Sequence, residues 1–209
     1  MNIRLEGKQT VEMPDGAASV YYFVATPRLP KGYDCHACHP VIAAMMTRYD
    51  VLTGEEKVLA PLQALTTMGY FGNYSMAQFG FPTIRTIGPG RIGLFFPNGD
   101  HGQGDQVSFV EVASIEPSGF RYLGALPTGE NMDGTGRCGR SSDTPSKPCA
   151  NWRAAIQIDS GTPGPYYAVR ISESGMRMND QYEAVETTAS YLVQFNGHEY
   201  ARVDGKNLF

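Results

Sequence analysis

Charged residues are scarce in this sequence, and they form no block. They make up 18% of the 209 residues, the formal net charge is −4, and lysine and arginine cluster nowhere. Binding to the phosphate backbone of a nucleic acid requires a basic patch, so a nucleic-acid partner is disfavoured. No run of 18 or more apolar residues occurs either. We therefore expect a chain that does not span a membrane.

The motifs of common hydrolases are also missing. The sequence contains no G-x-S-x-G, H-E-x-x-H or S-x-x-K, the patterns that mark several nucleophilic and zinc-dependent sites. Of its four histidines, His101 lies near Asp100 and Asp105, but no serine or cysteine is marked as its partner. We assign no catalytic residue, and a hydrolase with an unrecognised site is kept as an alternative.

Glycine and proline, by contrast, are abundant. The chain has 24 Gly and 14 Pro beside 42% hydrophobic residues, too many turn formers for a helical bundle and too much apolar content for a disordered chain. Segments rich in β-branched and aromatic residues indicate strands, for example at 19–27, 106–115, 152–158 and 166–172. We predict one all-β domain over residues 1–209, a sandwich or open barrel of about ten short strands with Gly/Pro-rich loops.

Three turn signals place hairpins within this pattern. Thr53-Gly54 separates two strand-like halves of the segment 41–65, and Asn196-Gly197 fits a two-residue type I′ turn. Residues 88–93 match G-x-G-x-x-G, but a dinucleotide site requires a helix to begin there. The strand-like LFFPNGD follows instead, so we predict a hairpin around Gly88–Gly90 and no bound dinucleotide.

A dense stretch of potential ligands, YDCHACHP, occupies residues 33–40. Cys35, Cys38 and His39 complete C-x-x-C-H, the pattern that attaches a c-type haem through two thioethers and an axial histidine. The same stretch could hold zinc with Cys138 or Cys149, but ten residues separate that second pair, whereas structural zinc sites commonly use two close pairs. A proline and a strand-like segment follow, where a haem site or a thioredoxin-like pair would place a helix.

This context favours a third interpretation, in which the cysteines form disulfide bonds that close short loops. The four cysteines lie two by two in turn-rich segments, as in proteins of oxidising compartments. Because a short loop closes at a low entropy cost, we expect disulfide bonds from Cys35 to Cys38 and from Cys138 to Cys149, with no cofactor. Disulfides indicate a periplasmic or secreted protein. The first residues lack the basic start and apolar stretch of an export signal, so we expect that a leader peptide has been lost.

Several stretches resemble a known group of sequences. LPKGYDCHACHPVIAAMM, RTIGPGRIGLFFPNGDHGQGDQVSFVEV, the paired cysteines before NWRAAIQI and the closing YLVQFNGHEYARV occur in this order. Together they resemble a loosely defined group of uncharacterised exported bacterial proteins with a "gy.CHAC.P" stretch and a C-terminal "Y.fdG..Y" hairpin. The resemblance runs from about Val20 to Val203, and it implies an exported β-rich protein.

Two further stretches have the composition of binding loops. In GYFGNYSMAQFG, residues 69–80, aromatic residues alternate with small and polar ones, and such rings supply rigid contact area. The alternative is a loop whose aromatics fold back onto the sheet. NGDHGQGD, residues 98–105, lacks the frame of a calcium loop and is predicted to be an exposed turn. We predict a partner-binding surface formed by Tyr70, Phe71, Tyr74, Phe79, Asp100 and His101.

These features predict an exported β-domain that binds another macromolecule, either a protein or a cell-envelope ligand. Analogy with small disulfide-stapled inhibitors indicates an inhibitor or immunity-type role as its specific form. The alternatives are a haem- or metal-bearing redox protein that uses Cys35, Cys38 and His39, and the hydrolase mentioned above.

Overall fold

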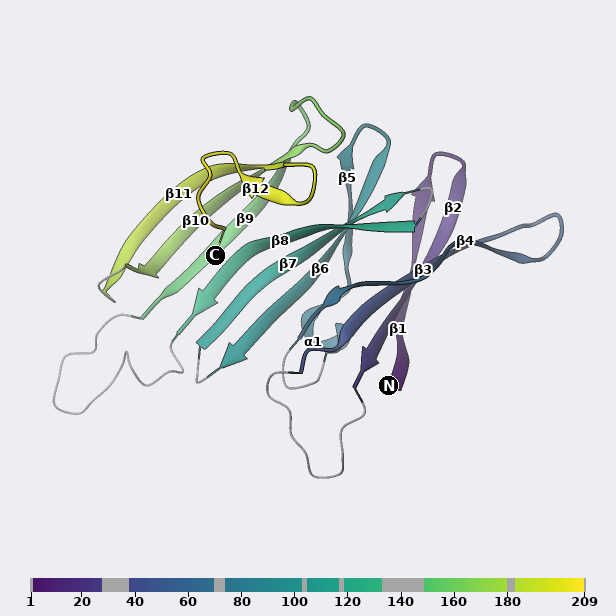
Figure 1. Cartoon of the computed structure of the whole chain (residues 1–209), viewed down its shortest axis with the longest axis horizontal. Helices are drawn as coiled ribbons and strands as arrows, with labels where there is room; N and C mark the ends of the chain where they lie inside the picture. Colours follow the sequence, from purple (N-terminus) through teal and green to yellow (C-terminus); the bar gives the residue numbers. More distant parts are fainter. Residues whose placement is uncertain are drawn as a thin grey trace, which may run out of the picture. The chain divides into compact units, whose positions relative to one another are not determined.

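The chain forms two antiparallel sheets, as the computed structural model shows (Figure 1). It describes residues 2–27, 38–69, 74–102, 105–116, 119–132, 149–179 and 183–208. The four-stranded sheet has the order β1-β2-β3-β4, and the eight-stranded sheet has the order β12-β11-β10-β9-β8-β7-β6-β5. The two sheets do not form a closed barrel. The prediction of an all-β fold is confirmed.

Many strands are longer than the sequence pattern indicated. The four-stranded sheet consists of β1 (Asn2–Met13), β2 (Gly16–Thr26), β3 (Val41–Tyr49) and β4 (Glu56–Thr67). The other sheet consists of β5 (Thr83–Gly88), β6 (Arg91–Gly102), β7 (Asp105–Glu116), β8 (Gly119–Asn131), β9 (Asn151–Asp159), β10 (Ala168–Met178), β11 (Ala184–Phe195) and β12 (Tyr200–Arg202). Six of these twelve described strands have 12 or 13 residues, so the expectation of short strands is corrected.

The structure groups into two compact units. The first comprises Met1–Asn98 and Glu111–Gly124, and the second comprises Gly99–Val110 and Ala125–Phe209. Strands β6, β7 and β8 therefore begin in one unit and end in the other. The single domain over residues 1–209 stays a prediction.

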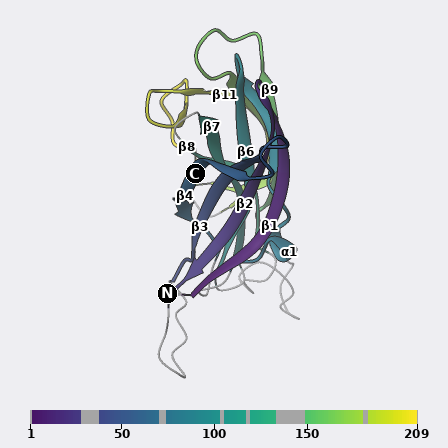
Figure 2. The ribbon, with the colours of Figure 1, turned by 90° about the vertical axis from the view of Figure 1, so that its right-hand side faces the viewer.

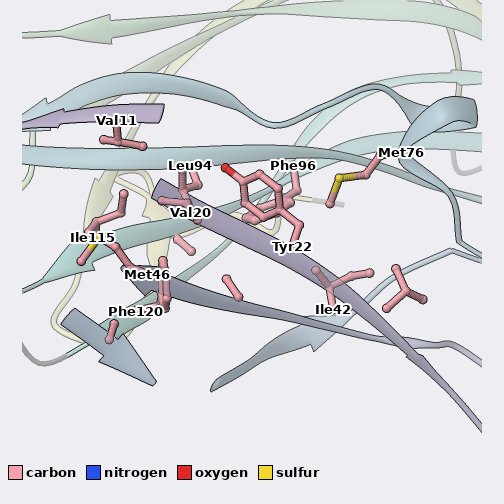
Figure 3. Packing of buried hydrophobic residues seen from close by; sticks show 14 of the residues in the cluster. Val11, Val20, Tyr22, Ile42, Met46, Met76, Leu94, Phe96, Ile115 and Phe120 are labelled. Carbon is pink, nitrogen blue, oxygen red and sulfur yellow. The ribbon is translucent and has the colours of Figure 1, made fainter. Parts of the chain in front are cut away.

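The core of the first unit lies between the four-stranded sheet and strands of the larger sheet (Figure 3). Alternate residues of β2, namely Ala18, Val20, Tyr22 and Val24, are buried, as the period of two in a strand requires. They pack against residues of the larger sheet such as Phe96, whose ring meets the Tyr22 ring edge-on at 5.6 Å. Each buried side chain of this size contributes about 1.5–3 kcal/mol. The first unit is thus a sandwich.

One side of this sandwich is closed by residues 74–82. This segment contains α1 (Met76–Phe79), whose first turn is capped by the Ser75 hydroxyl. It follows β1, the edge strand of its sheet: Arg4 donates to the Tyr74 carbonyl at 3.2 Å, and Gln9 donates to the Pro82 carbonyl at 3.1 Å. Figure 2 shows β1, β2 and β3 side by side, with α1 near β1. The segment therefore covers a strand edge that could otherwise pair with another chain.

Two of the predicted hairpins are confirmed. Gly88 pairs with Arg91, so β5 and β6 are antiparallel strands joined at Pro89-Gly90, and β6 continues as a strand beyond Gly93. The turn between β3 and β4 contains Gly54, whose φ of +72° lies in the left-handed region that glycine tolerates.

The C-terminal hairpin exists, but its loop is longer than predicted. Phe195 pairs with Tyr200, so four residues rather than two connect β11 and β12. The Asn196 side chain accepts hydrogen bonds from the backbone N–H groups of His198 and Glu199 at 2.9 and 3.0 Å. Asparagine thus builds the loop through its side chain, a role that the Asn-Gly dipeptide alone does not reveal.

The described part of the chain contains a single helix, the four-residue α1. No helix there has the length and apolar character needed to cross a membrane.

Candidate functional site

Three stretches far apart in the sequence meet at one place in the first unit. The Met68 N–H donates to the Pro40 carbonyl at 2.9 Å, and His39 Nδ1 lies 2.5 Å from the Gly69 carbonyl oxygen. The Gly69 N–H in turn donates to Asn98 Oδ1 at 2.8 Å. A carbonyl oxygen only accepts, so His39 carries a proton on Nδ1. The end of YDCHACHP, the start of the aromatic loop and the start of NGDHGQGD are thereby tied together.

The buried carboxylate of Glu111 is connected to this arrangement through Asn98. Asn98, Glu111 and Tyr122 lie on the adjacent strands β6, β7 and β8. The Asn98 amide donates to Glu111 Oε1 at 2.9 Å, and the Tyr122 hydroxyl donates to Glu111 Oε2. Glu111 is 5% exposed and Asn98 is 6% exposed. We call His39, Gly69, Asn98, Glu111 and Tyr122 the junction.

The electrostatics of the junction indicate a structural carboxylate. Burial raises the pKa of Glu111, and the hydrogen bonds from Tyr122 and Asn98 partly oppose this rise. Burial also raises the pKa of Tyr74, with the carboxylates of Glu6 and Glu111 adding to the effect. Both Glu111 oxygens are occupied and the side chain is shielded from solvent, so a substrate has no access to it. The carboxylate can hold three strands and a loop in place, because breaking the cluster would leave a buried polar group unsatisfied.

The structure places the described aromatics of the predicted binding loop in the sandwich. Tyr74 is fully buried, its hydroxyl donates to the Pro97 carbonyl at 3.0 Å, and its ring stacks on that of Phe79 at 4.9 Å. Phe79 packs against the core. Both residues therefore follow the alternative in which the aromatics fold back, and Tyr74 is corrected from a partner contact to a core residue. Tyr70 and Phe71 lie outside the described residues.

Asp100 and His101 are exposed at the far end of β6. They belong to the second unit, and the Asp100 carboxylate accepts a hydrogen bond from the His101 N–H at 2.8 Å. NGDHGQGD is therefore strand up to Gly102 rather than a turn throughout.

The structure describes two of the four cysteines, Cys38 and Cys149. Neither Cys38 nor Cys149 is a free thiol. Cys35, His36 and Cys138 lie outside the described residues, so the predicted pairing stays a prediction. Among the residues that are described, no three His, Cys, Asp or Glu side chains gather in a way that could hold a metal ion.

The buried members of the junction were not found from the sequence. Asn98, Glu111 and Tyr122 are 11 to 24 positions apart and become neighbours only when β6, β7 and β8 pair. One local signal exists, because Glu111 interrupts the apolar run SFVEVASI. A charge in such a run is either exposed or paired in the interior.

A second surface is apolar where a solvent-facing sheet is normally polar. Across the four-stranded sheet, Leu5 pairs with Phe23, Phe23 with Ala43, and Ala43 with Ala64. Leu5 is 54% exposed and Leu62 of β4 is 48% exposed, whereas Ala43 is 8% exposed. Phe23 alternates with the core residues Tyr22 and Val24, so this row lies on the side away from the core, which we call the outer face. Sheets packed on one side usually place polar residues on the other.

Neither a protein-family model, nor a curated protein, nor a solved structure matches this chain. The resemblance to exported bacterial proteins stays a prediction.

Proposed function

We propose that the chain is an exported binding module that contacts another protein with the junction end of its first unit. One observation supports the proposal above the others: Gly69 joins His39 on one side to Asn98 on the other. Loops that present binding residues are most effective when a rigid scaffold holds them. The junction holds three chain segments next to one another and leaves His39 exposed.

The cluster around Glu111 supports a surface that keeps its shape before a partner arrives. Asn98 and Glu111 are buried and linked to each other and to Tyr122. Such a network has few alternative arrangements, so little conformational entropy is lost when a partner binds.

A binding role accounts for these side chains better than the two alternatives. The hydrolase would require an accessible base, and Glu111 is shielded. The redox protein would use Cys35, Cys38 and His39, and Cys38 is not the free thiol that a zinc ion or a thioether link requires. The even number of cysteines supports export to the periplasm or beyond, with the disulfides Cys35–Cys38 and Cys138–Cys149. An inhibitor or immunity-type role is the specific form that we propose.

Site-specific photo-crosslinking tests the proposal. The photoreactive residue p-benzoylphenylalanine replaces His39 in one variant, Leu62 of the outer face in a second, and Arg170 of the second unit in a third. Each variant is produced in cells of the source organism and irradiated. We expect a protein adduct of one mass at position 39, and none at position 170. The captured protein is then purified and mixed with the unmodified chain.

Binding of the purified pair, weakened about tenfold or more by His39→Ala, would support the proposal, since tenfold corresponds to about 1.4 kcal/mol. An adduct formed at position 62 but not at 39 would assign binding to the outer face instead. Equal adducts at 39 and 170, or none at 39, would contradict the proposal.

A further inference from the structure

A polar hollow lies on the sheet of the second unit, apart from the junction. It occupies about 260 Å³ over β7, β8 and β9 and is lined by residues of these three strands, among them Gln106, Ser108, Asn131, Asn151 and Arg153. At ~30 Å³ per water molecule, it has room for roughly nine waters. It is smaller than the pockets of about 300–1,000 Å³ that hold drug-sized ligands, and its size suits a single sugar ring.

Gly129 of β8 contributes to the lining of the hollow. Gly129 pairs with Arg153 of β9. A Cβ atom at position 129 would lie 2.7 Å from the Trp152 carbonyl oxygen and 3.5 Å from the Arg153 Cα. The two strands approach too closely there for a side chain, so glycine is required at this position of the lining.

The register of β8 and β9 determines which side chains surround this floor. Asn131 pairs with Asn151 and Gly129 with Arg153, so Asn131, Asn151 and Arg153 lie on one face of the sheet. Glu130 and Trp152 pair between them and lie on the opposite face. The Trp152 indole N–H donates to Glu130 Oε2 at 2.8 Å, which engages one oxygen of that carboxylate, and both residues also contribute to the lining of the hollow.

Arg153 gives the hollow its positive charge, beside Glu130 in the same lining. Within the described part of the chain its guanidinium has no hydrogen-bond or ion-pair partner. The lining also includes the amide residues Gln106, Asn131 and Asn151 and the hydroxyl residues Ser108 and Thr128, whose side chains both donate and accept hydrogen bonds. A ligand with several hydroxyl groups can exchange hydrogen bonds with these side chains, and a carboxylate on that ligand can form a bidentate pair with the guanidinium. We propose that the hollow binds an acidic sugar, a pyranose ring that carries one carboxylate.

Nuclear magnetic resonance titration of the full chain tests this site. Glucuronate is added up to about 20 mM, far above a Kd of ~1 mM, and the backbone amide signals are followed. We expect saturable shifts that concentrate at Gly129, Asn131 and Asn151. Glucose, the matched neutral sugar, should bind at least about fivefold more weakly, because it cannot pair with Arg153.

Two variants and one control assign the contacts. Arg153→Gln should raise the Kd for glucuronate about tenfold and leave that for glucose unchanged, whereas Asn151→Ala should weaken both sugars. Gln157→Ala, on the same face of β9 but away from the hollow, should change neither. Shifts that map elsewhere, no saturation with glucuronate, or identical shifts with acetate alone would overturn the assignment. Each of these outcomes is independent of whether His39 contacts a partner.

Discussion

The guanidinium of Arg177 lies 4.3 Å from the centre of the Trp152 ring, while its Nη1 donates to Glu173 at 2.9 Å. One cation thereby joins β9 to β10 and neutralises a carboxylate that is 3% exposed. The Tyr191 hydroxyl of β11 donates to the other Glu173 oxygen at 2.7 Å. The Arg202 guanidinium of β12 then lies 3.8 Å from the Tyr191 ring. A connected row of side chains therefore crosses four strands of the second unit.

Removing the cation from this row should weaken the second unit. Arg177→Gln leaves Glu173 buried without its positive partner, and it also removes the contact with Trp152. We expect a loss of about 1–3 kcal/mol in the free energy of unfolding, measured by urea denaturation. Arg170→Gln is the matched control, because Arg170 and Asp159 are exposed and 3.8 Å apart, and it should change stability by less than about 0.5 kcal/mol. Equal losses in both variants would contradict the role of the row.

Because Tyr74 is buried, its substitution should lower the stability of the protein, whereas a residue of an exposed binding loop could be replaced with little loss. Tyr74→Ala should destabilise the protein by about 3–5 kcal/mol, since it empties a fully buried site in the core. Tyr74→Phe removes only the hydrogen bond to the Pro97 carbonyl and should lose about 0.5–1.5 kcal/mol. Chemical denaturation of both variants separates the ring from the hydroxyl. A loss below about 1 kcal/mol for Tyr74→Ala would place the ring outside the core.

Glu111 should make stability fall as the pH rises from acid toward neutral. Its pKa in the folded state is raised from the ordinary value of 4.5, so the folded protein binds the proton more tightly than the unfolded chain. The stability from this group is fully present below 4.5 and is lost as the pH rises through the higher folded pKa. The matched variant Glu111→Gln removes the titrating group. It should flatten this part of the curve of unfolding free energy against pH, measured by urea denaturation at each pH. Identical profiles for both proteins would contradict the raised pKa.

The cysteine pairing is tested by mass. Two disulfides lower the intact mass by four hydrogens, and peptide mapping should recover the pairs Cys35–Cys38 and Cys138–Cys149 separately. A covalently attached haem, or four thiols that bind one zinc ion, would instead support the redox alternative.

Local signals predicted the hairpins of this fold well. The turn at Pro89-Gly90 and the turn at Gly54 each depend on a residue whose backbone preference is visible in the sequence. The position of the loop after Phe195 was predicted correctly, but its length was predicted wrongly. The Asn196 side chain builds a four-residue loop instead of a two-residue turn.

Long-range pairing explains what the sequence could not show. Asn98 and Gly99 begin the stretch that was predicted to be an exposed turn, yet they lie inside β6, where Asn98 bonds Gly69 and Glu111. Gly129 likewise interrupts an apolar pattern but lies within β8, where its missing side chain permits the close approach of β9. In both cases tertiary contacts override the local preference.

Hydrogen–deuterium exchange tests the contact site of the proposed binding module most directly. The full chain is compared alone and in complex with the partner that photo-crosslinking recovers. Slower exchange in the complex is predicted at residues 38–40, 68–69 and 97–98, with little change in β9 to β12. Protection confined to the outer face or to the second unit, with unchanged exchange at the junction, would contradict the proposed site.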